Sequence, residues 1–209
     1  MTTATNATSY NVVLLNDVST SGTSVSDGHT LFGNGFTVTD ARNHPRARTN
    51  ALVTINGGIV DNAFFKGYEP TETSVFFGTG GTGNPDTAPI VYVTGAYSQI
   101  YNSHVSGGRL AVSFIDASDA YMENTVADGG SIASIGIEKS YVTLKDCVTT
   151  LSTQGGIKGA GIYVPDANQG HLTIITKVNQ IISLRRRCVS TTSPRTLTSL
   201  TDEGGRYKP

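Results

Sequence analysis

Short runs of alternating apolar and polar residues recur at a constant interval between residues 90 and 161. Ile100-Tyr-Asn102, Met122-Glu-Asn124 and Leu144-Lys-Asp146 begin at positions 100, 122 and 144, so the step between them is constant. A second set lies upstream in each unit with the same step: Val91-Tyr-Val93, Ser113-Phe-Ile115, Ile135-Gly-Ile137 and Ile157-Lys-Gly159. Alternation with a period of two predicts strands, and a repeat of about 22 residues predicts a solenoid.

The repeat also predicts which side chains stack on one another. Equivalent residues of neighbouring coils should lie about 4.8 Å apart, the spacing of adjacent strands. Two inward columns are expected to form the core: Val93, Ile115 and Ile137, and then Ile100, Met122 and Leu144. A third column, at a bend, is interpreted as structural, because Asn tolerates a left-handed backbone and its amide can bond to the next coil. Its members are Asn102, Asn124 and Asp146.

Less regular segments flank the repeat and divide the chain into four parts. Residues 1–11 are interpreted as a polar lead-in, and residues 12–165 as the solenoid, with a long loop at 66–89. The end of a solenoid must be covered, so residues 166–184 are interpreted as a C-terminal capping segment. Residues 185–209 are rich in Thr, Ser, Pro and Gly and are expected to be a flexible tail.

Composition limits the classes of partner and cofactor that are expected for this chain. Charged residues make up 15% of the 209 residues and the net charge is −1, which argues against nucleic acid binding. No apolar run is long enough to span a bilayer, and no signal peptide pattern is seen at the N-terminus. No cluster of Cys and His suggests a metal, and calcium has no ligand motif, so no cofactor is expected. Cys147 takes the place of Ser103 and Thr125 near a turn, and its pairing with Cys188 stays open.

The repeat resembles the right-handed parallel β-helix of the pectin-lyase-like superfamily over roughly residues 12–165. The resemblance rests on Val142-Thr-Leu144-Lys-Asp146-Cys-Val148, on Ile100-Tyr-Asn102 and on the entry motif Asp27-Gly-His-Thr-Leu31-Phe-Gly-Asn-Gly35-Phe-Thr-Val38. It implies an all-β, single-stranded right-handed parallel β-helix, with a coil as long as the sequence repeat, about 22 residues. That superfamily includes polysaccharide lyases, glycoside hydrolases, epimerases, phage tailspikes and surface adhesins, with sites on the outer face of one sheet.

One outward face of the predicted solenoid carries candidate chemistry. Asp116 and Glu138 are one repeat apart, which would make them neighbours in adjacent coils. Like charges that close raise one pKa, so one carboxyl could act as a general acid. Tyr92 and Phe114 could stack on sugar rings. Arg109 or Lys158 could neutralise a uronate carboxylate.

Three hypotheses remain open, because exposed solenoid faces often carry carboxylates without any function. The first is a lyase, hydrolase or epimerase that acts on an acidic polysaccharide. The second is a noncatalytic glycan-binding or adhesive solenoid. The third is a structural β-helix that self-associates through an uncapped end. We favour a carbohydrate-associated protein, extracellular or on a cell or virion surface. Two other features are expected to be structural, namely the stacked charges Glu123 and Lys145 and a partly packed His104.

Overall fold

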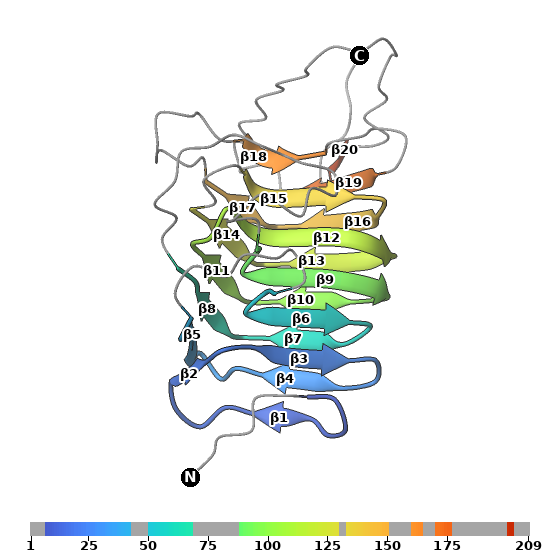
Figure 1. Ribbon diagram of the computed structural model, residues 1–209. Coiled ribbons are helices and arrows are strands. Elements are labelled where there is room, and N and C mark those ends of the chain that lie inside the picture. Colours follow the sequence, from blue (N-terminus) through green and yellow to red (C-terminus); the bar gives the residue numbers. More distant parts are fainter. Residues whose placement is uncertain are drawn as a thin grey trace, which may run out of the picture.

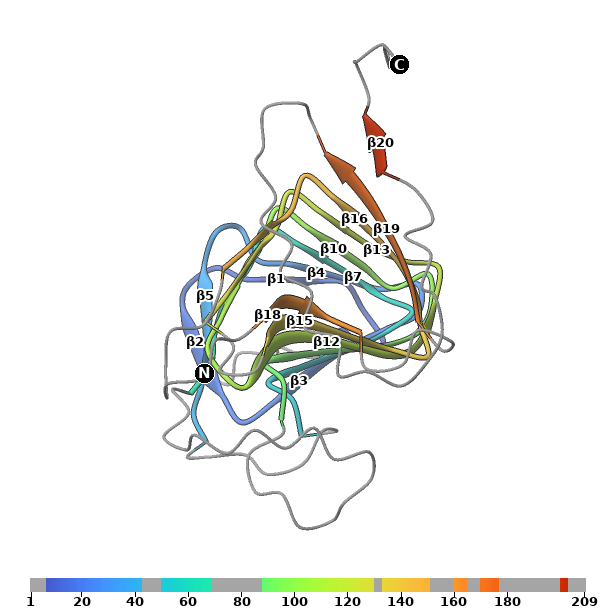
Figure 2. The same cartoon turned by 90° about the horizontal axis from the view of Figure 1, so that it is seen from above.

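The chain winds into a right-handed parallel β-helix, as the repeat predicts (Figure 1). The computed structural model describes residues 7–42, 50–68, 88–129, 133–150, 160–164, 170–176 and 200–202. Within these residues all regular secondary structure is β-strand, and the strands form three parallel sheets, here called A, B and C. The sheets enclose the core on three sides when the stack is seen along its length (Figure 2). No helix among the described residues is long and apolar enough to cross a membrane.

Each coil passes from sheet B to sheet C to sheet A. Sheet B contains β1 (Val12–Val13), β4 (Thr30–Phe32), β7 (Ile59–Asp61), β10 (Gln99–Tyr101), β13 (Ala120–Glu123), β16 (Tyr141–Lys145), β19 (His171–Thr176) and β20 (Leu200–Asp202). Sheet C contains β2 (Val18–Thr20), β5 (Thr37–Asp40), β8 (Phe64–Lys66), β11 (His104–Ser106), β14 (Val126–Asp128) and β17 (Val148–Thr149). Sheet A contains β3 (Thr23–Ser26), β6 (Val53–Asn56), β9 (Val91–Ala96), β12 (Leu110–Ser118), β15 (Ala133–Glu138) and β18 (Ala160–Tyr163).

The inner column of sheet B confirms the predicted register. Ile100 pairs with Met122, and Met122 pairs with Leu144, so each step spans one sequence repeat. The column extends in both directions beyond the prediction, to Leu31, Val60 and Ile174. All six side chains are buried. Burial of each such aliphatic side chain contributes about 1.5–3 kcal/mol, so this column is a main source of stability.

The bend between sheets B and C contains the predicted ladder of Asn residues. Asn102, Asn124 and Asp146 all have a left-handed backbone, with φ of 48°, 47° and 49°. The amide nitrogen of Asn124 donates to Oδ1 of Asn102, and the amide nitrogen of Asn102 donates to Oδ1 of Asp61, each over 2.8 Å. The interpretation of this column as structural is therefore confirmed.

The register of sheet A differs from the predicted one, and the prediction of one inward column is wrong at one position. Phe114, expected to face outward, is fully buried and pairs with Val93 and Ile137. Ile115, expected in that inward column, is half-buried and pairs with Glu138. The cause is an irregularity in β12, where the register with β9 shifts between Phe114 and Ala117. The extra residue at this point displaces the alternation of β12 by one position.

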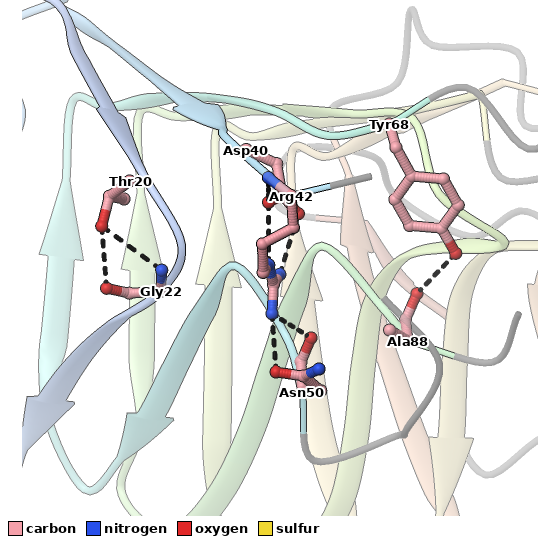
Figure 3. A network of polar contacts seen from close by, with 7 residues as sticks. All are labelled: Thr20, Gly22, Asp40, Arg42, Asn50, Tyr68 and Ala88. Carbon is pink, nitrogen blue, oxygen red and sulfur yellow. Dashed lines mark hydrogen bonds and ion pairs between the residues drawn. The ribbon is translucent and has the colours of Figure 1, made fainter. Parts of the chain in front are cut away.

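The connections from sheet C to sheet A carry the insertions, and their roots are fixed by polar contacts (Figure 3). Arg42 binds both carboxylate oxygens of Asp40 at 2.8 Å and the backbone and side-chain oxygens of Asn50 at 2.7 Å. The hydroxyl of Tyr68 donates to the backbone oxygen of Ala88 over 3.4 Å. Of the predicted loop at 66–89, residues 69–87 lie outside the described residues.

At both ends, described residues of the stack lie within the segments interpreted as lead-in, cap and tail. Ala7, in the predicted lead-in, is fully buried and bridges Val25 at the edge of sheet A. At the other end, β19 continues sheet B within the segment interpreted as a cap, and β20 pairs with β19 within the segment interpreted as a tail. The described sheet therefore extends beyond residue 165. Residues 177–199 and 203–209, which include Cys188, lie outside the described residues.

Candidate functional site

The carboxylates predicted to form a pair are not partners in the sheet. Glu138 pairs with Ile115, while Asp116 occupies the irregular part of β12 with a left-handed backbone, φ 52°. Asp116 is exposed and Glu138 is half-buried. Because the bulge moves Asp116 out of the strand alternation, the regular stacking on which the predicted pair depended does not apply at this position.

The other residues predicted for this face are also scattered. Tyr92 is half-buried and pairs with Ser113, not with Phe114. Arg109 is only 1% exposed, so it does not present a charge to solvent as a uronate partner would. Next to Tyr92, the outward positions Ser113 and Gly136 are buried. Lys158 lies outside the described residues.

A different surface, the outer face of sheet B, gathers aromatic and charged side chains. We call it the tyrosine face and define it by the outward residues of β10, β13, β16 and the first residue of β19. These are Gln99, Tyr101, Tyr121, Glu123, Tyr141, Thr143, Lys145 and His171. They alternate with the buried column that includes Ile100, Met122 and Leu144, so the same register that builds the core positions this face.

The tyrosines form a diagonal row across three coils. Tyr101 and Tyr121 lie on neighbouring strands, with ring centroids 5.8 Å apart and ring planes tilted by 49°. Tyr141 lies on the next strand, two residues before Thr143, which pairs with Tyr121. Tyr141 pairs with His171, and their rings are stacked with centroids 4.4 Å apart. Tyr141 is 55% exposed, so the row presents aromatic surface to solvent.

Hydrogen bonds fix the first two tyrosines of the row. The hydroxyl of Tyr121 donates to Oε2 of Glu123 over 2.9 Å, and the hydroxyl of Tyr101 donates to Oε1 of Gln99 over 2.8 Å. Nζ of Lys145 lies 3.3 Å from Oε1 of Glu123, which confirms the predicted stacking of these charges. Burial, and then the nearby Glu123 carboxylate, raise the pKa of both tyrosines, so both hydroxyls stay protonated donors at neutral pH.

The sequence contains a signal for this face, but the signal does not follow the length of the repeat. The tyrosines recur at positions 101, 121 and 141, so their step is two residues shorter than the repeat. Each tyrosine is therefore shifted by two residues per coil, which keeps it on the same face. Once the inward column was assigned, inspection of the residues that flank each member would have identified the row.

The face of sheet C contains another predicted feature, His104. It pairs with Val126 as expected, and its ring meets Phe64 edge-on with centroids 6.2 Å apart. Nε2 of His104 lies 3.9 Å from Oδ2 of Asp128. These contacts agree with a partly packed histidine. Among the described residues, no group of three or more His, Cys, Asp or Glu is placed to hold a metal ion.

Comparisons with known proteins do not assign the chain to a family. No family model matches it, and neither the curated proteins nor the solved structures contain a significant match.

Proposed function

We propose that this protein is a noncatalytic glycan-binding β-helix and that the tyrosine face contacts the sugar chain. The observation that carries the proposal is the diagonal row Tyr101, Tyr121 and Tyr141 on three consecutive coils. Aromatic side chains combine a large apolar surface with a polar group, and so they can pack on the apolar side of a sugar ring while bonding to its hydroxyls. Gln99, Glu123 and Thr143 supply further hydrogen-bonding groups beside the row.

The dimensions of the row suit a linear polymer. Each step along the diagonal crosses one coil, about 4.8 Å, and two residues of strand, roughly 6.6 Å. The ring centroids of Tyr101 and Tyr121 lie closer together than this, 5.8 Å apart, and this separation is comparable with the length of a sugar unit. An extended oligosaccharide laid along the diagonal would contact several rings at once.

The resemblance of the repeat to the pectin-lyase-like superfamily supports a carbohydrate partner and a place outside the cell or on a virion surface. Within that superfamily the noncatalytic interpretation is favoured here, because Asp116 and Glu138 are not strand partners. The enzymatic alternative predicts turnover of a uronate-containing polysaccharide that is lost in Asp116→Asn and Glu138→Gln. Such turnover would mean that the protein is an enzyme and would refute the noncatalytic interpretation.

Binding to a panel of immobilised glycans, followed by titration calorimetry with the best oligosaccharide, tests the proposal. Tyr121→Ala and Tyr141→Ala should each weaken binding by about 1 kcal/mol, or roughly fivefold. Tyr10→Ala is the matched control, because Tyr10 is 79% exposed on the first coil, away from the row. Binding that is unaffected by both face variants, or equally weakened by Tyr10→Ala, would refute the role of this face.

A further inference from the structure

Among the residues that the structure describes, carboxylates outnumber ammonium groups on and beside the tyrosine face. Glu123 lies on the face, Asp61 lies next to Tyr101 on the neighbouring strand β7, and Asp119 is exposed at the corner before β13. Among the described strands of sheet B from β4 to β19, Lys145 is the sole Lys or Arg at an outward position. At the corner between sheets A and B, Asp116 and Glu138 add two acidic groups and Lys139 adds one basic group.

The single lysine of the face is already engaged. Nζ of Lys145 lies 3.3 Å from Oε1 of Glu123, and the two side chains are 27% and 30% exposed. Lys145 therefore compensates for one carboxylate and leaves Asp61 and Asp119 in excess. Asp61 accepts a bond from the neutral amide of Asn102, which does not cancel its charge. The part of the surface made by the described residues is consequently negative.

We propose that the tyrosine face selects glycans that carry free amino groups, such as polymers of amino sugars that are not acetylated. The inference rests on the proposed glycan binding and specifies the class of ligand. Protonated amino groups would form charge-assisted hydrogen bonds with Asp61 and Asp119, the two carboxylates that Lys145 does not compensate. They would also be attracted to the faces of Tyr121 and Tyr141, whose rings carry negative electrostatic potential.

The same charges disfavour the acidic polysaccharide expected from the sequence. A uronate carboxylate on the diagonal row would lie near Glu123 and Asp61 and be repelled by both. Of the two cations that suggested an acidic ligand, Arg109 is buried and so does not offset this repulsion. Lys158 lies outside the described residues. Like-charge contacts of this kind give specificity against wrong partners.

Three oligosaccharides of equal length test the inference with the full chain. These are a β-linked oligomer of N-acetylglucosamine, its fully deacetylated counterpart and an oligogalacturonate. Titration calorimetry at low salt should show the deacetylated oligomer binding about tenfold more tightly than the acetylated one, and the oligogalacturonate binding least. The preference should shrink at high salt, because screening shortens the range of exposed charges to about 8 Å or less.

Charge-neutral variants test whether the preference comes from this face. The double variant Asp61→Asn and Asp119→Asn should lose most of the preference, although the side-chain oxygen at position 61 still offers an acceptor to the amide of Asn102. Asp17→Asn is the matched control, since Asp17 is exposed at a bend of the first coil.

Two results would overturn the inference while leaving glycan binding intact. One is equal affinity for the acetylated and deacetylated oligomers. The other is a preference that survives the double variant. Absence of binding that depends on Tyr121 for all three oligomers would instead overturn the proposed function and this inference together.

Discussion

The amide nitrogen of Asn124 lies 2.8 Å from Oδ1 of Asn102 in the coil before it, and both residues have a left-handed backbone, with φ of 47° and 48°. The two properties belong together at this bend. The left-handed backbone allows the chain to turn from sheet B to sheet C within two residues. The side-chain amide then adds a second link between adjacent coils, beside the backbone bond from the nitrogen of Asn124 to the oxygen of Lys145. Asn provides both at one position.

Replacement of Asn124 can separate these two contributions. Asn124→Ala should lower the free energy of unfolding by about 2–3 kcal/mol, because it loses the amide bond and because alanine, unlike asparagine, has no polar side chain that favours a left-handed backbone. Asn124→Gly should lose about half as much, since glycine adopts this backbone without penalty but cannot make the bond. Urea unfolding followed by circular dichroism measures both. Equal losses would mean that the backbone conformation adds no cost for alanine.

Hydroxyl groups next to the same bend form a second ladder. The backbone nitrogen of Ala63 donates to Oγ of Ser103, and this hydroxyl donates to the backbone oxygen of Tyr101. One coil further, the backbone nitrogen of Ser103 donates to Oγ1 of Thr125, which donates to the backbone oxygen of Glu123. Cys147 continues the column, with Sγ 3.3 Å from the backbone oxygen of Lys145. The prediction of a small side chain near a turn is confirmed.

The ladder predicts a cost for removing one hydroxyl. Ser103→Ala should lower the free energy of unfolding by about 1–3 kcal/mol, because the buried nitrogen of Ala63 loses its acceptor. Ser103→Thr is the matched control and should stay close to the parent protein, since Thr125 occupies the equivalent position one coil later. Thermal unfolding of the three proteins would compare them. An Ala variant as stable as the Thr variant would contradict the ladder.

The sequence predicted sheet B and its bends better than sheet A, and the difference has a physical origin. Met122 lies midway in sequence between its partners Ile100 and Leu144, so the coil keeps a constant length there. In sheet A, the step from Val93 to its partner Phe114 is one residue shorter than the repeat, and the step from Phe114 to Ile137 is one residue longer. The repeat length is thus only an average in sheet A. A single extra residue inverts which side chains face inward, and neither composition nor alternation shows where it is inserted.

The candidate site shows the same limit. The predicted pair Asp116 and Glu138 depended on the register of sheet A and is not a strand pair. The tyrosine face depended on the regular register of sheet B, and its members could be identified from the residues flanking the inward column. Lys158 was placed by extending the regular step, yet Ile135 pairs with Ile162, five residues further along than that step allows. Because residues are inserted in the connections from sheet C to sheet A, adding one repeat length to a known position does not predict the equivalent residue of the next coil.

A close approach of two coils predicts a position where any side chain is excluded. A Cβ at Gly33 would lie 2.4 Å from Cα of Ala63 in the next coil. Gly33→Ala should therefore force the coils apart. The expected loss of unfolding free energy lies at the upper end of the range for overpacked cores, which is about 1–3 kcal/mol. Gly22→Ala is the control, because its Cβ would meet nothing nearer than the backbone oxygen of Ala51 at 3.8 Å. Urea unfolding should show little change for Gly22→Ala, and similar losses in the two variants would refute this contact.

Cys147 predicts a dependence of stability on pH. Burial raises the pKa of its thiol from 9.0 to about 11. The folded state therefore keeps the proton that the unfolded state releases above about pH 9. The stabilising contribution is fully present below about pH 9 and is lost as the pH rises through about 11. In Cys147→Ser the decline of unfolding free energy between about pH 8 and about pH 11 should be smaller than in the parent protein.

The same thiol should react slowly with alkylating reagents, since only the thiolate attacks. A pKa about two units above that of an ordinary thiol lowers the thiolate fraction roughly a hundredfold near pH 8. The Cys188→Ser variant leaves Cys147 as the single thiol of the chain, so the measured rate with iodoacetamide belongs to Cys147. The rate in the folded protein should rise steeply as the pH approaches about 11, and in urea it should match that of a small thiol. Equal rates in the folded and unfolded protein at about pH 8 would show that the hydrogen bonds from Sγ to the backbone oxygens of Met122 and Lys145 do not shield this thiol.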